Sequence, residues 1–279
     1  MPKKTKIVAT ISNLNCSPEF IRGLYEAGIN VVRLNTAHMT HDDALEVIEN
    51  TRKVSDGIGI LLDTKGPEIR TCPSDQPLSV KYGDSIRLKG APGEKSTGTT
   101  ICVSYENFVA DIPVGSSILI DDGLIALAVM DKDDEYLTCV VENDGVINAR
   151  KSINIPSVHV TLPALSQKDR DFIAFAADQD LDFIAHSFVR NKEDVIAVQD
   201  ILDRKKSPIK IIAKIENAEG VEKIDEIMDH AYGIMIARGD LAVEIPTEQI
   251  PLIQKQIVRA CIEKRRPVIV ATQMLHSMI

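Results

Sequence analysis

Short apolar runs alternate with helical segments along most of this sequence, and this order constrains its fold more than any other feature. Apolar strands are predicted at 7–11, 30–35, 58–63, 183–189, 209–215, 233–237 and 267–271. Each of these strands except the third is followed by a segment with helical spacing. Five of these segments lie at 17–28, 40–54, 192–204, 218–230 and 251–265, and the sixth begins at 272. Strands joined by helices form parallel sheets covered on their faces. The sequence therefore predicts an α/β fold of the (β/α)₈ barrel type.

The alternation stops one unit short of a closed barrel. A barrel of this type needs about eight strands, and the residues at 272–279 have the pattern of a helix that is only beginning. A barrel without its last unit would carry two unpaired strand edges. Two alternatives remain open from the sequence: a short chain that a partner completes, or an open doubly wound sheet.

Residues from about Cys72 to Ile155 interrupt the alternation. Helical periodicity is lost there, and short alternating runs lie between turn signals such as Asp122-Gly123 and Asn143-Asp144-Gly145. A loop of this length is uncommon inside a compact domain, so we expect a small inserted β domain. The predicted division is 1–71 for the first part of the barrel, 72–157 for the insert and 158–279 for the second, incomplete part of the barrel.

The composition excludes several classes of protein. The net charge of −9 argues against a nucleic-acid partner, which normally meets a basic face. No apolar run reaches the roughly 18 residues of a membrane span, and the N-terminus has no signal-peptide pattern, so we expect a cytoplasmic protein. The five cysteines are scattered and form no CxxC pair, which is typical of reduced packing thiols.

Polar residues gather where the predicted strands end, which in such a barrel is the side of the active site. Lys214 and Glu216 are two residues apart, so on a strand they point the same way. Glu216 and Asp240 end neighbouring strands, and two carboxylates beside cations suit Mg²⁺, completed by water and substrate oxygens. Arg33, Arg70, Lys151 and Lys214 are candidate phosphate contacts. The residues alone predict metal-assisted phosphoryl or enolate chemistry, and a network of interstrand salt bridges is the alternative.

Six sequence strings, in order and across nearly the whole chain, resemble the pyruvate kinase family. They are TKIVATI at 5–11, VRLN at 32–35, LDTKGPEIR at 62–70, IAKIEN at 212–217, ARGDL at 237–241 and ATQML at 271–275. The resemblance implies the N-terminal part of such a kinase, with most of its barrel and its mobile β-barrel lid but without its C-terminal part. It also implies Mg²⁺-dependent transfer of a phosphoryl group from phosphoenolpyruvate to ADP, giving pyruvate and ATP in glycolysis.

The resemblance assigns roles residue by residue. Catalysis would fall to Lys214 and Thr272, and substrate binding to Arg33, Lys214, Gly239, Asp240 and Thr272. Glu216 and Asp240 would bind Mg²⁺ or Mn²⁺; Asn35, Asp63 and Thr64 would bind K⁺; and Asn35, His38, Arg70 and Lys151 would contact the nucleotide. The family forms homotetramers, so we expect a homo-oligomer.

The chain also departs from the family pattern at several positions. Ala37 stands where the family usually has a serine that completes the K⁺ site, so we expect altered potassium dependence. Two other classes of function stay open: a metal-dependent lyase or aldolase acting on pyruvate or oxaloacetate in a related barrel, and an inactive fragment. The lyase would need neither Arg70 nor Lys151.

Overall fold

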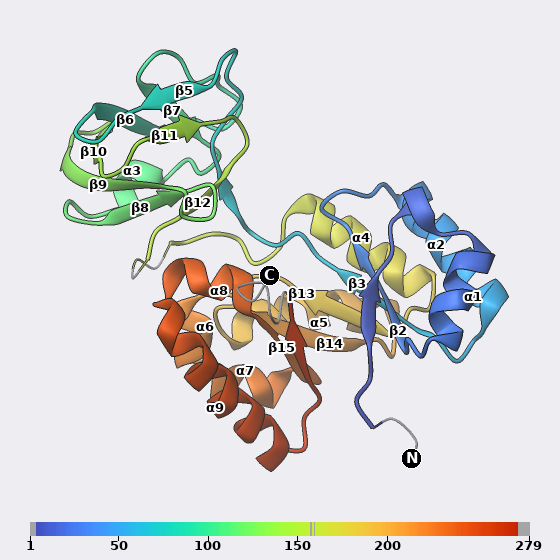
Figure 1. Ribbon diagram of the computed structural model, residues 1–279. Helices are drawn as coiled ribbons and strands as arrows, with labels where there is room; N and C mark the ends of the chain where they lie inside the picture. Colours follow the sequence, from blue (N-terminus) through green and yellow to red (C-terminus); the bar gives the residue numbers. More distant parts are fainter. Residues whose placement is uncertain (1–3, 157, 159, 273–279) are drawn as a thin grey trace.

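The computed structural model describes residues 4–156, 158 and 160–272, and these form two lobes, each built round its own β-sheet (Figure 1). The larger lobe holds a seven-stranded sheet in the order β1-β2-β3-β13-β14-β15-β16, with every neighbouring pair parallel. Its strands are β1 (Val8–Thr10), β2 (Val31–Asn35), β3 (Gly59–Asp63), β13 (Phe183–His186), β14 (Lys210–Ile215), β15 (Gly233–Ala237) and β16 (Val268–Ala271). Among the described residues, β1 and β16 are the two edges, as the prediction of a barrel lacking one unit requires.

Helices follow the strands and pack on one face of this sheet. They are α1 (Pro18–Glu26), α2 (His41–Val54), α4 (Gln167–Asp178), α5 (Lys192–Lys205), α6 (Ala218–Glu222), α7 (Ile224–His230), α8 (Arg238–Glu244) and α9 (Ile250–Glu263), with short 3₁₀ turns at Asn13–Asn15 and Thr247–Gln249. Outward-facing strand residues such as Leu34, Leu62 and Ile234 join the helices in one large core. A second, smaller cluster, including Leu61 and Ile212, fills the inner face. Burial on both faces explains the nearly continuous apolar strands.

Three of the helices begin at side-chain caps, of which Ser17 and Ser166 are recognisable as caps in the sequence. The Ser17 hydroxyl accepts a hydrogen bond from the Phe20 amide, and Pro18 occupies the first helical position. Thr40 and Ser166 each form a capping box with the aspartate three residues on, Asp43 and Asp169. These local bonds satisfy amides that a helix leaves unpaired at its start.

The smaller lobe, which we call the lid, contains the strands between 69 and 154. Its main sheet has the order β4-β12-β8-β9-β10-β6-β7, and β11 pairs with β5. The elements are β4 (Ile69–Arg70), β5 (Leu78–Val80), β6 (Ser85–Gly90), β7 (Thr100–Val103), α3 (Phe108–Asp111), β8 (Ser117–Ile120), β9 (Ile125–Lys132), β10 (Leu137–Val141), β11 (Gly145–Ile147) and β12 (Ser152–Asn154). The lid has its own apolar core. The exact domain limits at 71 and 157 stay a prediction.

Some predicted boundaries were wrong. Strand β13 ends at His186 rather than at 189, because Phe188 has a positive φ of 55° that no strand accommodates. The single helix predicted at 218–230 is divided at Lys223, whose φ of −99° and ψ of 19° leave the helical region. The short helices α3 and α8 carried no recognised signal. The helix predicted at 272–279 lies outside the described residues apart from Thr272.

The cysteines and the lengths of the described helices agree with the sequence expectations. All five cysteines are free and buried; burial raises the pKa of Cys139 to about 12 and that of Cys261 to about 11, so these thiols stay protonated near neutral pH. Within the described ranges, every helix is too short or too polar to cross a bilayer.

Candidate active site

The register of the parallel strands brings the predicted polar residues to one end of the barrel sheet. Asn35 lies opposite Asp63, Asp63 lies opposite Ala185, and Ala185 lies opposite Ile212. Alternation then puts Asp63 and Lys214 on the inner face, directly above the apolar cluster of Leu61 and Ile212. The charged side chains at the strand ends thus lie directly above the apolar side chains of the inner face.

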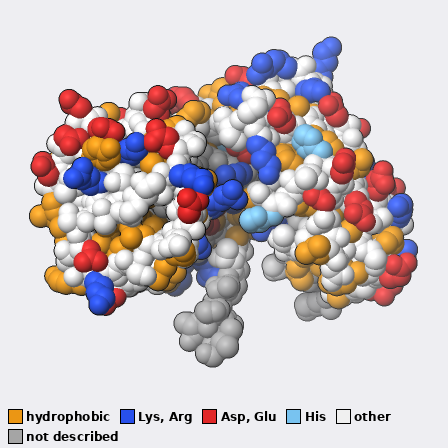
Figure 2. Space-filling view, turned by 90° about the horizontal axis from the view of Figure 1, so that it is seen from above, with side chains coloured by type: hydrophobic (Ala, Val, Ile, Leu, Met, Phe, Trp, Pro, Cys, Tyr) orange, Lys and Arg blue, Asp and Glu red, His pale blue; other side chains and the backbone are white. Residues whose placement is uncertain are grey.

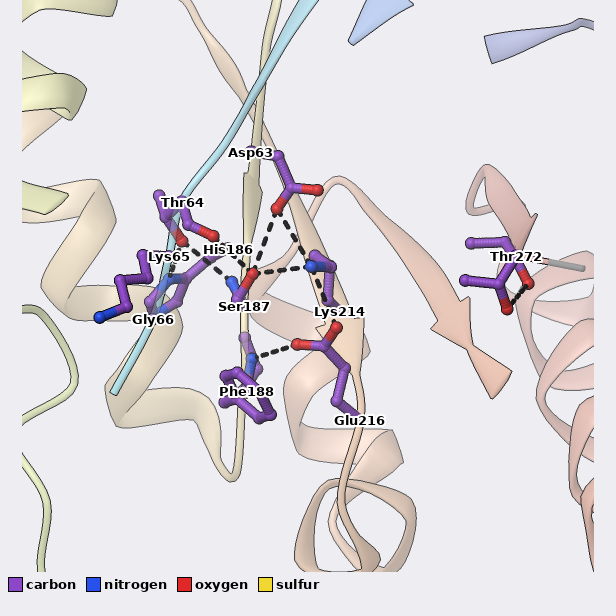
Figure 3. A network of polar contacts seen from close by, with 12 residues as sticks. Asp63, Thr64, Lys65, Gly66, His186, Ser187, Phe188, Lys214, Glu216 and Thr272 are labelled. Atoms are coloured by element: carbon purple, nitrogen blue, oxygen red, sulfur yellow. Dashed lines mark hydrogen bonds and ion pairs between the residues drawn. The ribbon is translucent and has the colours of Figure 1, made fainter. Parts of the chain in front are cut away.

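Asp63 pairs with two cations at this end of the sheet, and Figure 3 shows its contact with one of them, Lys214. Its Oδ2 lies 2.5 Å from Arg33 Nε, and its Oδ1 lies 3.1 Å from Lys214 Nζ. Arg33 Nη1 also donates to the Thr10 hydroxyl at 2.9 Å. The Asp63 side chain is only 2% exposed, so both cations are held in place by a carboxylate that water scarcely reaches.

Lys214 is the most highly connected cation of the site. Its Nζ donates to Ser187 Oγ at 2.7 Å and lies 3.0 Å from Glu216 Oε1. Burial by itself would lower the pKa of this amine, but the carboxylates of Glu216 and Asp63 outweigh burial and raise the pKa above its ordinary value. Lys214 therefore carries a permanent positive charge, and the contact with Glu216 confirms that the two side chains point the same way.

Glu216 is a buried carboxylate with an unusual titration. Its Oε2 accepts a hydrogen bond from the Phe188 amide at 2.7 Å. Burial raises its pKa to about 7, and the nearby Asp240 carboxylate adds to the rise, although Lys214 opposes it. A buried carboxylate and a partly exposed one that repel each other are a good setting for a divalent cation, whose charge would hold both ionised.

The donor set fits Mg²⁺ or Mn²⁺ but is small. Within the described ranges no group of three or more metal-ligating side chains comes together. Glu216 and Asp240 would therefore supply two carboxylates, and the other positions would be left to water or to substrate oxygens, as Mg²⁺ prefers. Each Glu216 oxygen has one partner, Lys214 Nζ for Oε1 and the Phe188 amide for Oε2, so each keeps a lone pair that a cation could use.

The predicted potassium ligands fit their ion less well. Both oxygens of Asp63 already face cations. Asn35 Oδ1 accepts a hydrogen bond from the Ala37 amide at 3.2 Å, and Ala37 adds no side-chain oxygen. The Thr64 carbonyl accepts from the Ser187 hydroxyl at 2.6 Å. The set of oxygens is thus incomplete for K⁺.

Three neighbouring residues were not predicted as site residues. Ser187 stands between Lys214 and the Thr64 carbonyl, and its amide donates to Thr64 Oγ1 at 3.0 Å. His186 is fully buried with Nδ1 3.2 Å from Thr64 Oγ1, and burial lowers its pKa to about 4. Asp169, besides capping α4, accepts the Lys65 amide at 2.9 Å. Strand alternation from Ala185 could have identified Ser187; the other two needed the tertiary structure.

Thr272 lies apart from the Lys214 network (Figure 3) and close to Gly239. A Cβ added at Gly239 would stand 3.7 Å from Thr272 Oγ1. Thr272 is exposed, with a positive φ of 68°, and its hydroxyl donates to the Ala271 carbonyl at 2.7 Å. Asp240 links the two places, since it follows Gly239 and acts electrostatically on Glu216.

The predicted nucleotide contacts are divided between the two lobes. Asn35 and His38 belong to the barrel lobe, where His38 is exposed. Arg70 and Lys151 belong to the lid, where Arg70 pairs with Glu68 at 2.8 Å and Lys151 with Asp121 at 3.1 Å. Lysine and arginine side chains gather where the lobes face each other (Figure 2). The structure therefore does not bring all four residues together.

These features define a class: an α/β-barrel protein with a β lid, whose mouth can bind an anion together with a divalent cation. Comparison with known proteins narrows the class. The family described as pyruvate kinase, barrel domain, matches residues 2–279. The chain is 50% identical to a pyruvate kinase of Borreliella burgdorferi, over 99% of this chain and 58% of that protein. It is 43% identical to one of Staphylococcus aureus, over 99% of this chain and 48% of that protein.

A solved structure agrees with the sequence relatives. A pyruvate kinase from Cryptosporidium parvum superimposes with a TM-score of 0.94 at 38% identity, covering 99% of this chain and 59% of that one. The chain belongs to the pyruvate kinase family. It spans about half the length of the curated relatives it matches.

Proposed function

We propose that this chain is part of a pyruvate kinase, a glycolytic phosphotransferase that moves the phosphoryl group of phosphoenolpyruvate to ADP. The observation that carries the proposal is the position of Lys214, permanently charged and 2.7–3.1 Å from Ser187, Glu216 and Asp63 at the strand ends. Phosphoryl transfer needs little covalent help from the protein and depends on positioning and charge neutralisation. A rigidly held lysine supplies both.

The substrate phosphate would bind to Arg33 and Lys214. Arg33 is partly exposed on one side while Asp63 fixes its Nε, so its outer nitrogens can donate to phosphate oxygens. Lys214 would face the transferring group and the enolate oxygen that it leaves. Charged donors held in advance stabilise such developing charge without reorganisation.

The reaction balances with one proton taken up from solvent. A bond forms between a β-phosphate oxygen of ADP and the phosphorus, and the bond from phosphorus to the enol oxygen breaks. The enolate then takes a proton at C3, on the side of Thr272, and becomes pyruvate. A divalent cation held by Glu216 and Asp240 would neutralise phosphate and carboxylate charge, with the Gly239 and Asp240 backbone facing the substrate carboxylate.

The nucleotide would bind between the lobes. Asn35 and His38 would contact it from the barrel, and Arg70 and Lys151 from the lid, which implies that the lid approaches the barrel when ADP binds. We propose K⁺ as a second cation near Asn35, Asp63 and Thr64, with weakened dependence because Ala37 supplies no oxygen. A homo-oligomer in the cytoplasm completes the proposal; light scattering of the purified protein tests the oligomer.

The test is a coupled assay of pyruvate formation from phosphoenolpyruvate and ADP, with Mg²⁺, with Mn²⁺ and with neither. The proposal expects pyruvate only when both ADP and a divalent cation are present. Pyruvate released from oxaloacetate without ADP would favour the lyase alternative instead. A folded protein that forms no pyruvate under any of these conditions would contradict activity of the chain by itself.

A further inference from the structure

The loop from Ser187 to Arg190, between β13 and α5, contacts the two segments that connect the barrel to the lid. It also contacts Lys214 and Glu216. We call residues 64–68 the outgoing hinge and residues 160–165 the returning hinge. A cavity of about 220 Å³ lies between these hinges and the barrel, lined in part by Pro67, Ile155, Phe188 and Arg190. The hinges therefore have room to move beside this loop.

Arg190 holds the returning hinge. Its Nη2 donates to the Leu162 carbonyl at 2.9 Å and its Nη1 to the Val160 carbonyl at 3.2 Å. Asp194 accepts two further hydrogen bonds from the same guanidinium, from Nε to Oδ2 and from Nη2 to Oδ1, both at 3.0 Å. Asp194 is 4% exposed and belongs to the first turn of α5. One planar side chain thus ties two hinge carbonyls to a buried carboxylate of the barrel.

The same loop packs against the outgoing hinge. A Cβ added at Gly66 would come within 2.8 Å of Ser187 Cβ and 2.9 Å of the Ser187 carbonyl, and Gly66 has a φ of 74°. Only glycine allows this approach. On the other side of the outgoing hinge, Asp169 accepts the Lys65 amide. Both hinges are therefore fixed close to the loop.

At its other side the loop contacts the site. The Ser187 hydroxyl accepts from Lys214 Nζ, the Phe188 amide donates to Glu216, and the Val189 amide donates to the Lys214 carbonyl at 3.3 Å. Phe188 adopts its left-handed backbone conformation between these contacts (Figure 3). Such a conformation persists only when its surroundings enforce it, and here these surroundings are the site and the hinges.

We propose that Arg190 is a positioning residue that couples the lid to the phosphoryl-transfer site. Arg190 holds the returning hinge against the loop that orients Lys214 and Glu216. When a nucleotide binds, the lid would then approach the barrel while this hinge stays in place. This inference rests on the proposed function. It needs arginine, because a lysine can keep the charge opposite Asp194 but has no planar fork to reach both carbonyls.

The first experiment measures hinge opening without any need for activity. Thermolysin cleaves before aliphatic residues, and the returning hinge offers Val160 and Leu162. Wild type, Arg190→Lys and Arg190→Gln are compared with Lys205→Gln, which breaks an exposed ion pair with Asp178 at the far end of the same helix. Loss of the charged hydrogen bonds should speed hinge cleavage about tenfold in both Arg190 variants, and Lys205→Gln should match wild type.

The second experiment separates coupling from simple destabilisation. In Arg190→Lys we expect the KM for ADP to rise about tenfold while the KM for phosphoenolpyruvate stays within about twofold, because the barrel contacts are kept. Unchanged hinge cleavage in Arg190→Lys, or an equal rise of both KM values, would overturn the inference. A wild type without transfer activity would contradict the proposed function, while the ratio of cleavage rates would still decide whether Arg190 holds the hinge.

Discussion

The barrel mouth and the lid both carry charged residues assigned to the same reaction, but they hold them differently. In the barrel, Asp63 and Glu216 are 2% exposed and Lys214 is 10% exposed, and each touches its partners directly. In the lid, Arg70 and Lys151 are each 38% exposed and paired with carboxylates at the surface. The barrel site is therefore formed in advance, whereas under the proposed function the lid would contribute its cations by moving.

The largest expected difference between the two lobes is the loss of unfolding free energy when an aspartate that pairs with a cation is changed to asparagine. Asp63→Asn leaves Arg33 and Lys214 without their shared carboxylate, and removal of one partner from a buried ionic group costs about 3–5 kcal/mol. Asp121→Asn removes the partner of Lys151 in the lid and should cost about 0–1 kcal/mol. Urea unfolding monitored by circular dichroism measures both. Equal losses would show that the barrel network is no better formed than a surface pair.

Protonation of His186 at low pH should lower the free energy of unfolding of the barrel lobe. Its pKa of about 4 in the folded protein lies below the ordinary 6.5, so the unfolded chain takes up the proton first. The stability from neutral His186 is complete above pH 6.5 and is lost as the pH falls towards 4, by up to about 3 kcal/mol. Glu216, whose pKa is raised from 4.5 to about 7, acts in the opposite direction between pH 7 and 4.5, and because its shift is of similar size it offsets most of this loss.

A substitution separates the two contributions. His186→Gln removes the histidine proton uptake and keeps that of Glu216, so between pH 7 and pH 5 the unfolding free energy of the variant should rise relative to that of wild type. Cys139 in the lid core, with a pKa of about 12, stays neutral throughout and adds nothing to this slope. Parallel pH dependences in wild type and variant would exclude His186 as the cause.

Lid cations should affect nucleotide binding alone. Lys151→Ala removes one charged contact, for which we expect the KM for ADP to rise about tenfold and the KM for phosphoenolpyruvate to change little. The matched control is Lys95→Ala, a lid lysine 61% exposed in its pair with Asp75. Steady-state kinetics with each substrate varied in turn give both constants. A rise in both KM values would mean that Lys151 serves the barrel site directly.

The smallest effect is expected at Ala37. Ala37→Ser restores a hydroxyl oxygen beside Asn35 and should increase activation by K⁺ by a few-fold, on the order of 1 kcal/mol. Rates measured over a series of KCl concentrations at constant ionic strength test this. An identical response in wild type and variant would contradict the proposal that Ala37 weakens the dependence on K⁺.

Local patterns in the sequence predicted much of the barrel. Apolar runs predicted the seven strands, the capping residues Ser17 and Ser166 predicted helix starts, and spacing placed Lys214 and Glu216 on one side. Contacts between distant segments could not be predicted in this way. The left-handed Phe188 depends on its neighbours in space, and Arg190 meets the Val160 carbonyl only in the folded chain. Family resemblance, not pattern, supplied the roles of Arg70 and Lys151.

The most direct measurement is phosphoryl transfer by Lys214→Met beside Lys210→Met. Both change the same residue type on β14, but Lys210 is exposed at the far end of the strand and Lys214 lies in the site. We predict that Lys214→Met lowers kcat by about 10³-fold or more, because the charge that meets the transferring group is lost, while Lys210→Met keeps the wild-type rate. Comparable rates in the two variants would contradict the assignment of this barrel mouth as the phosphoryl-transfer site.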